Sequence, residues 1–310
     1  MTIVNIAVSG GRTSAYMACW MERNRSVVAD HIGCSEEDLE YVFTFANTGM
    51  EHDDTLRFMH DVDQKLLGGQ VVWLEGVVQH DQRVSTKHRV VTYETAYRST
   101  QWQDPLHPFH DVVRKYGVPN VSMMYCTREL KMNPIDSYFR DTYGLRRQKK
   151  GCEVWVAVGI RDDENRRVSK NAGVQKILYP LCDLNPVDKQ DVLDWFEQFE
   201  WDLAIPEWQG NCQGCYKKSF KKLNKVWLET PEAFEFTDFI EQEYGFIGAE
   251  FAKHGLTRPR TSFRGNRSAR DMIAMFRENP ADPSEYIDVM QDAGCSESCE
   301  MFPTEVINDE

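Results

Sequence analysis

The sequence predicts an α/β protein: a doubly wound, mostly parallel sheet, followed by a mainly helical C-terminal region that contains cysteines and arginines. Three observations predict this. Short apolar runs alternate with helix-like patterns up to about residue 200. The first run ends in Ser-Gly-Gly and passes directly into a helical pattern, and after Pro206 the strand-like runs give way to Lys-, Arg- and Cys-rich sequence. Strands that alternate with helices typically build a parallel sheet.

Four apolar runs are expected to form strands: residues 3–8, 41–46, 70–75 and 154–158. Helices are expected over residues 13–24 and 187–199, and after residue 47 with Asp53 or Asp54 as the cap. The span 78–125 contains several prolines and histidines and is predicted to be an irregular insertion or lid. A boundary near residue 205 is expected to divide the chain into residues 1–205 and 206–310.

Composition narrows the classes of function. The chain has 310 residues, 41% of them hydrophobic, and a net charge of −13. The acidic balance disfavours broad, non-specific nucleic-acid binding. The sequence contains neither an 18-residue apolar stretch nor a secretory signal pattern at the start, so we expect a cytoplasmic protein without a membrane partner. An oligomer is compatible with these totals.

The first strand-to-helix junction, Ser9–Ser14, has the residue types of an anion site. Backbone N–H groups and a helix N-terminus attract phosphate oxygens, and glycines let the backbone approach a ligand closely. The alternative is a tight turn that only reverses the chain. The residues that would contribute are Ser9, Gly10, Gly11, Arg12, Thr13 and Ser14.

Several motifs resemble, in order, those of the PP-loop ATP pyrophosphatase and phosphoadenosine phosphosulfate (PAPS) reductase superfamily. "SGGRTS" is similar to its pyrophosphate loop, and "NTGME" to its NTG-x-E segment. The later matching segments are "YCTRELKMNPID" (125–136), "VGIRDDENRR" (158–167) and "YPLCDLNPVDKQDVLDWF" (179–196). The resemblance covers about residues 3–200. It implies that residues 1–205 form a PP-loop nucleotide-binding domain that takes ATP with Mg²⁺.

The resemblance also implies roles for individual residues. The loop would surround the pyrophosphate, and the second strand would end in a nucleotide-lining segment, Asn47, Thr48 and Gly49. Residues across the cleft would bind the ribose or the reacting phosphate and orient charge there: Gly159, Arg161, Glu164 and Arg167. The implied catalytic residues are Arg12, Lys131, Arg161 and Glu164.

The sequence departs from this pattern in the loop, and the implied residues have simpler interpretations. Arg12-Thr13 replaces the usual Lys-Asp pair, which keeps the positive charge and removes a carboxylate that would contact Mg²⁺. Asn47–Gly49 has the alternative of a strand-ending turn. Arg161 and Arg167 have the alternative of solvated surface charges, and Lys131 that of an ordinary helical lysine.

The cysteines suggest a metal centre. Cys212-x2-Cys215 is a spacing that zinc and iron–sulfur sites use. The resemblance places Cys126 where related proteins carry cluster cysteines. A [4Fe–4S] cluster held by Cys126, Cys212, Cys215 and Cys299 is the first hypothesis; zinc is the second, and reduced thiols without a metal are the third.

Two basic clusters stand out from the acidic background and suggest contact with a nucleic-acid backbone. The alternative is a solvated helix face. The clusters comprise Lys217, Lys218, Lys221 and Lys222, and then Arg258, Arg260, Arg264, Arg267 and Arg270.

Three functions follow from these features. The first is an enzyme that binds ATP and catalyses adenylyl or sulfur-related transfer to a nucleotide or nucleic acid. The second is PAPS-type sulfonucleotide reduction, for which Cys295 is the terminal thiol, although the catalytic segment of the reductases is absent. The third is a nucleotide-binding module that has lost its chemistry and works in a complex.

Overall fold

A computed structural model describes residues 1–81, 83–120, 123–146, 153–210, 212–247, 262–264 and 266–282. Its centre is a six-stranded sheet in the order β4-β3-β2-β1-β5-β6. The neighbours β1–β2, β2–β3, β1–β5 and β5–β6 are parallel, and β3–β4 is antiparallel. The predicted α/β class with a mostly parallel sheet is therefore confirmed. The strands are β1 (Thr2–Val8), β2 (Leu39–Asn47), β3 (Val72–Val77), β4 (Lys87–Val91), β5 (Trp155–Val158) and β6 (Ile177–Leu178).

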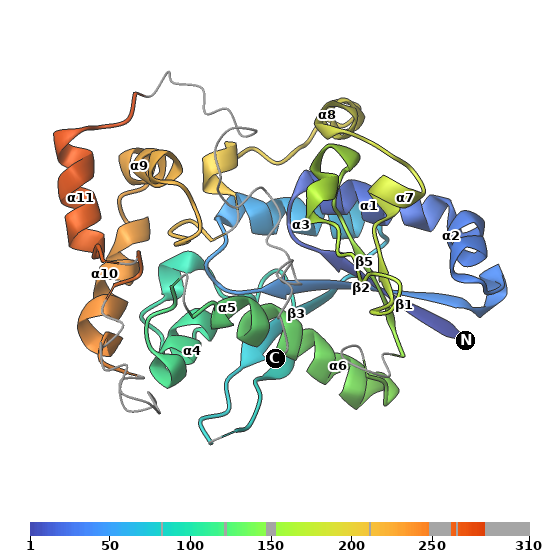
Figure 1. Ribbon diagram of the computed structural model, residues 1–310, viewed down its shortest axis with the longest axis horizontal. Coiled ribbons are helices and arrows are strands. Elements are labelled where there is room, and N and C mark those ends of the chain that lie inside the picture. The colour runs from blue at the N-terminus through green and yellow to red at the C-terminus, as the bar shows by residue number, and fades with distance from the viewer. Residues whose placement is uncertain are drawn as a thin grey trace.

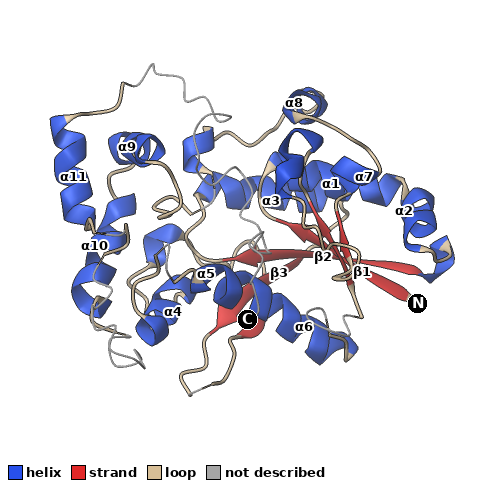
Figure 2. Ribbon diagram, viewed as in Figure 1, coloured by secondary structure: helices blue, strands red, loops and turns tan. Residues whose placement is uncertain are grey.

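Helices lie on both sides of the sheet (Figures 1 and 2). They are α1 (Arg12–Arg23), α2 (Arg25–Ile32), α3 (Asp53–Leu66), α4 (Pro108–Tyr116), α5 (Tyr125–Thr127), α6 (Asn133–Tyr143), α7 (Pro180–Asp183), α8 (Lys189–Phe196), α9 (Phe220–Glu229), α10 (Ala233–Tyr244) and α11 (Ala269–Glu278). A π-helical turn, Arg128–Met132, joins α5 to α6.

The side chains of β1 show why this strand forms the centre of the sheet. Val4, Ile6 and Val8 pack into a cluster with residues of α1 and α3, whereas Ile3 and Ala7 pack on the opposite face with Ile135 and Phe139 of α6. A strand that is covered on both faces reads as an almost continuous apolar run. The run at residues 3–8 is such a pattern.

The span 78–125 differs from the prediction of an irregular insertion. It contains β4, which extends the sheet, and α4, whose Phe109, Val112 and Val113 are buried. The strand β4 has the sequence KHRVV and lies at the edge of the sheet, where polar residues are tolerated and the apolar signal is weak. Capping also differs: His52 caps α3, not Asp53 or Asp54, whereas α8 begins after the acidic cap Asp188.

The C-terminal helices α9, α10 and α11 lie beyond the carboxyl edge of the sheet, opposite the N-terminus (Figure 1). Residues of the C-terminal part pack directly against residues of the first part. Tyr216, Phe236 and Ile240 share one buried cluster with Met50 and Phe109. The boundary near residue 205 thus stays a prediction about chain organisation.

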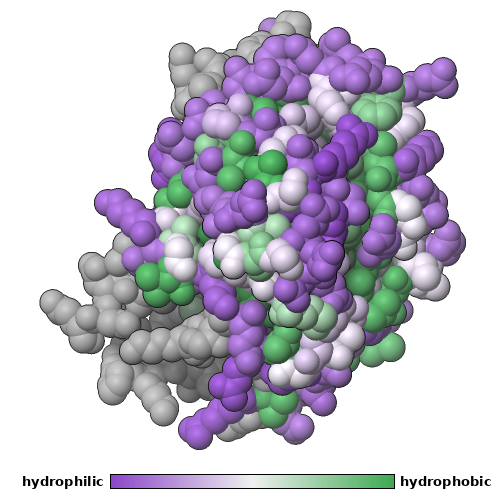
Figure 3. Space-filling view, turned by 90° about the vertical axis from the view of Figure 1, so that its right-hand side faces the viewer, coloured by the Kyte–Doolittle hydropathy of each residue, from purple (hydrophilic) through white to green (hydrophobic). Residues whose placement is uncertain are grey.

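The face seen in Figure 3 is mostly hydrophilic, with hydrophobic groups interspersed. In the part of the chain that the structure describes, no helix has both the length and the apolar character that crossing a bilayer requires.

Candidate functional site

The Ser9–Ser14 loop joins β1 to the N-terminus of α1. The backbone N–H of Ser9 donates to Ser14 Oγ at 3.0 Å, and Ser14 Oγ donates to the Gly11 carbonyl at 3.0 Å. Gly10 has a φ of +87°, and a Cβ there would lie 2.6 Å from Thr55 Cγ2. The first turn of α1 contains no acidic residue. The positive end of the helix dipole is therefore not offset by a carboxylate of its own first turn.

The segment after β5 lies directly against this loop. Because β1 and β5 are adjacent and parallel, Gly159 follows β5 beside Ser14, and a Cβ on Gly159 would lie 3.0 Å from Ser14 Cα. Arg161 donates from Nη1 to Thr13 Oγ1 at 3.2 Å. The structure thus brings together the predicted residues of the two motifs. The strand order reverses between β1 and β5, and open α/β sheets bind ligands at such a position.

Arg161 is mostly buried, with 9% of its surface exposed, and acidic neighbours surround it. Its guanidinium forms two bonds to Asp163, at 2.8 and 3.1 Å, and lies 3.5 Å from Glu164. Arg167 Nη1 lies 2.6 Å from Glu164 Oε1. The interpretation of Arg161 and Arg167 as freely solvated charges is therefore wrong, because both belong to an ion-paired cluster at the loop.

Arg12, which the resemblance places beside the pyrophosphate, is bound in this structure by a carboxylate of the same chain. Its Nε and Nη2 form two bonds with the Asp202 carboxylate, at 2.8 and 2.9 Å, and Nη2 also donates to the Leu203 carbonyl. The donors of this guanidinium that would bind a phosphate are thus taken by a carboxylate of the same chain.

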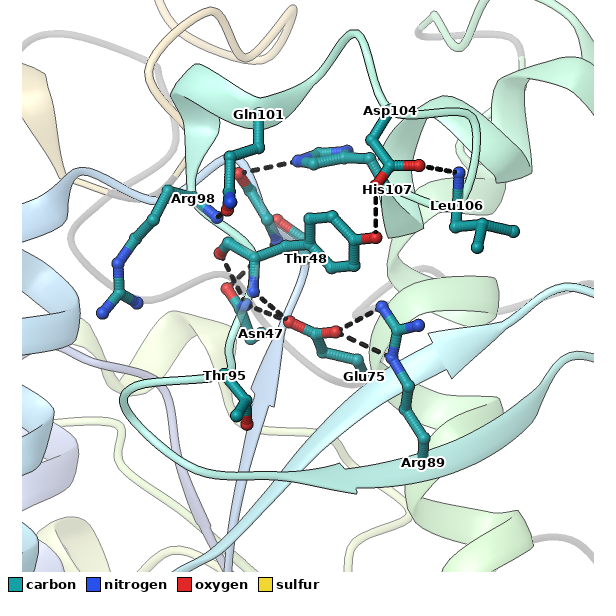
Figure 4. A network of polar contacts seen from close by, with 12 residues as sticks. Asn47, Thr48, Glu75, Arg89, Thr95, Arg98, Gln101, Asp104, Leu106 and His107 are labelled. Atoms are coloured by element: carbon teal, nitrogen blue, oxygen red, sulfur yellow. Dashed lines mark hydrogen bonds and ion pairs between the residues drawn. The ribbon is translucent and has the colours of Figure 1, made fainter.

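Asn47, which the resemblance implies to line the nucleotide, is bonded to three parts of its own chain. It is fully buried; its Nδ2 donates to Glu75 Oε1 at 2.6 Å and to the Tyr97 carbonyl at 2.9 Å, and its Oδ1 accepts from Gly49 N–H. Figure 4 shows this network, in which Arg89 also binds Glu75. Asn47 fixes the turn at the carboxyl end of β2.

His107 closes this turn from the other side. It is completely buried, and its Nε2 lies 3.2 Å from the Gly49 carbonyl. Its Nδ1 accepts from His110 N–H, so the tautomer that satisfies both contacts carries its proton on Nε2. Burial lowers the pKa of His107 to about 4.

This burial predicts a pH dependence of stability. In the unfolded chain the imidazole titrates near 6.5, so protonation between pH 6.5 and 4 favours unfolding. We expect the unfolding free energy of the wild type to fall relative to that of His107→Gln by up to about 3 kcal/mol over this interval, and not above pH 7. Urea unfolding at a series of pH values measures it.

Glu241 acts with the opposite sign in the same interval. Burial raises its pKa to about 7, so its protonation stabilises the folded state as the pH falls below 7. Because the wild type and His107→Gln both contain Glu241, the difference between their unfolding free energies reports the titration of His107 alone. A difference that does not change with pH would contradict the buried neutral imidazole.

Three of the four predicted metal-ligating cysteines line one cavity of about 40 Å³: Cys126, Cys212 and Cys215. Thr48 Oγ1 lies 3.5 Å from Cys212 Sγ, and Lys131 also lines the cavity. Lys131 is 7% exposed, so it is not an ordinary solvated helical lysine.

The thiols share a cavity without forming a metal site as they stand. Among the described residues, no group of three or more His, Cys, Asp or Glu side chains is arranged to hold a metal ion. Cys299 and Cys295 lie outside the described residues. The cluster and the zinc site stay predictions, and no reaction step is derived through either.

The chain is similar to one curated protein along nearly its whole length. The relative is the uncharacterized nin region protein ORF290 of Escherichia phage lambda, which is 32% identical over 305 residues, or 96% of this chain and 94% of the relative. The chain belongs to the family of this phage protein. No protein-family model matches the chain, and no solved structure matches it. The name of this relative assigns no activity that could be transferred to the chain.

Burial corrects the predicted basic surface. Lys218 and Lys222 are each 1% exposed: Lys218 Nζ donates to the Trp208 carbonyl at 2.6 Å, and Lys222 Nζ lies 3.4 Å from Glu207 Oε1. Neither lysine can contact a nucleic-acid backbone in this structure. Lys217 and Lys221 are not buried.

The arginine cluster is only partly described. Arg264 and Arg267 lie over the Phe220 ring, 4.9 and 5.1 Å from its centroid, and Arg270 pairs with Asp238 at 2.7 Å. Arg258 and Arg260 lie outside the described residues. Nucleic-acid contact through this cluster stays a prediction.

Two residues of the site were not singled out from the sequence, Glu75 and Asp202. Glu75 is the one charged residue in the apolar run QVVWLE. A lone acid within an apolar run is the signal that was available for Glu75, since a buried carboxylate needs a partner. Asp202 offered no such signal, because Glu200 lies two residues before it.

Proposed function

We propose that this protein binds an adenine nucleotide through its phosphates, at the Ser9–Ser14 loop and the segment after β5. The observation that carries the proposal is the contact of Gly159 with Ser14 where the strand order reverses. In this proposal the sheet is doubly wound and follows the PP-loop plan. The chemistry would be adenylyl or sulfur-related transfer to a nucleotide or nucleic acid.

The described residues support positioning and charge stabilisation. The loop N–H groups and Ser9 Oγ would hold the terminal phosphates, while a substrate oxygen attacks the α-phosphorus and pyrophosphate leaves. Arg161 would stabilise the charge that develops, held in place by Asp163 and Glu164. Mg²⁺ would be bound through the triphosphate oxygens, since the loop itself lacks an acidic residue.

PAPS-type reduction is the second candidate because three thiols line one cavity beside Thr48, at the same edge of the sheet. The third candidate, a module without chemistry, is favoured by the occupation of Arg12 by Asp202. The second candidate differs from the first in the nucleotide that it should prefer. The third differs in that it should bind the nucleotide without turning it over.

Calorimetric titration of the purified protein with ATP and Mg²⁺, and separately with PAPS, tests the proposal. We expect Ser9→Ala to weaken nucleotide binding by about tenfold or more, because a hydrogen bond to a charged phosphate is lost. The matched control is Ser35→Ala, which changes a serine that caps a short helix before β2, at the opposite edge of the sheet.

Preference for PAPS would favour the reductase. ATP binding without pyrophosphate release in the presence of candidate acceptors would favour the module. If neither nucleotide binds, or if Ser9→Ala and Ser35→Ala bind equally well, the nucleotide site is wrong.

A further inference from the structure

Residues 202–210, here called the cover segment, lie across the phosphate loop. Four residues of the loop side, Ser9, Gly10, Gly11 and Thr55, face residues of the cover segment. The space between them has a volume of only about 10 Å³. This is about the room that one water molecule requires, and a phosphate group does not fit.

Polar contacts to α1 and α3 hold the start of the cover segment. Its later part is held by other contacts, among them those of Lys218 with the Trp208 carbonyl and of Lys222 with Glu207. Asp202 binds Arg12 through two parallel hydrogen bonds. Arg57 Nη2 donates to the Asp202 carbonyl at 2.7 Å, and Ala204 N–H donates to Asp54 Oδ2 at 2.6 Å. These contacts, together with the Arg12 bond to the Leu203 carbonyl, join the start of the cover segment to α1 and α3, the helices that follow β1 and β2.

The Arg12–Asp202 pair has the geometry with which arginine also binds phosphate. A guanidinium presents a planar fork that matches two oxygens of either group. The Arg12 side chain is 14% exposed and that of Asp202 is 40% exposed, so solvent reaches the carboxylate more easily than the guanidinium. The Asp202 carboxylate can therefore turn toward solvent more easily than the Arg12 guanidinium can.

We propose that Asp202 is a built-in competitor for the ligand's phosphates and that the cover segment must be displaced for the ligand to bind. This inference rests on the proposed nucleotide function. It also predicts which ligands bind. A ligand with a doubly charged terminal phosphate can replace the singly charged Asp202 at Arg12, whereas a nucleoside without phosphate has no group that binds Arg12.

The cover segment also connects two sites. Beyond Gly210, Cys212 forms an antiparallel bridge with Glu51, and Gln213 N–H donates to the Met50 carbonyl at 3.3 Å. The cover segment therefore continues into the chain that lines the thiol cavity.

The test compares wild type with Asp202→Asn, first without ligand. We expect amide hydrogen exchange in a peptide covering 203–210 to become faster in Asp202→Asn, since the ion pair that anchors the segment is lost. The matched control, Asp238→Asn, removes the two-bonded pair with Arg270 between α10 and α11 and should leave this peptide unchanged. Unchanged exchange in Asp202→Asn overturns the anchor.

The second measurement adds ATP with Mg²⁺, PAPS or adenosine. We expect Asp202→Asn to bind the preferred nucleotide about fivefold more tightly than wild type and adenosine no more tightly. Weaker or equal nucleotide binding by the variant overturns the competition. Absence of nucleotide binding in both proteins overturns the proposed function instead, while the ligand-free exchange still decides whether Asp202 anchors the segment.

Discussion

Replacing Glu75 by alanine is expected to lower the free energy of unfolding by about 3–5 kcal/mol, the range for removing one partner of a buried ion pair. Glu75 is completely buried on β3. One oxygen accepts from Asn47 Nδ2 at 2.6 Å and from Tyr97 N–H at 2.7 Å, and the other accepts from Arg89 at 2.6 and 2.9 Å. Truncation leaves these donors without their acceptor, and buried donors without partners are costly.

The expected loss extends beyond stability, because Asn47 holds the turn at the carboxyl end of β2. Urea unfolding followed by tryptophan fluorescence measures the free energy. Glu94→Ala is the matched control, since Glu94 is exposed and belongs to the segment that follows β4; a change within about 0.5 kcal/mol is expected. Equal effects of the two substitutions would contradict the role of Glu75.

Gly49→Ala is expected to destabilise the protein by about 3 kcal/mol, from two costs. Gly49 has a φ of +82°, which disfavours a side chain, and the new Cβ would lie 2.5 Å from His107 Nε2. The imidazole is completely buried and cannot swing into solvent to make room.

Gly33→Ala separates the two costs. Gly33 has a similar φ of +77° at the end of α2, but a Cβ there meets nothing within 4 Å. We expect this substitution to cost about 1 kcal/mol, the backbone cost alone. Thermal and urea unfolding of both variants give the difference, and equal losses would show that the His107 contact carries no energy.

The central strands were predictable because burial on both faces makes their sequences almost continuously apolar. The edge strand β4 was not, since KHRVV places three basic or polar residues before two valines and so lacks the alternation of a half-buried strand. The two-residue strand β6 is too short to produce a pattern. Both misses concern elements whose identity depends on the neighbouring strand and not on their own residues.

The resemblance implied that the loop and the segment after β5 face one another, and the structure brings the two segments into contact. Partners far apart in the chain were not predictable. Asp202 lies 190 residues from Arg12, and neither residue signals the other. Lys218 and Lys222 read as surface lysines, because a basic run is usually solvated. Only the fold shows that Lys218 donates to a backbone carbonyl and that Lys222 pairs with Glu207.

The π-helical turn at Arg128–Met132 determines how the residues before it are rotated about the helix axis relative to the residues after it. Such a turn contains one residue more than α-helical spacing requires. Deleting one residue here would restore regular α-helical winding and leave the two flanking parts in nearly the same rotational relation, because the turn itself takes up the extra residue. Cys126 and Lys131 now line the same cavity while α6 covers the sheet. A shortened chain would keep α6 on the sheet but lose the bulged turn that contains Lys131, so a gap at this position in a relative would mark a changed site.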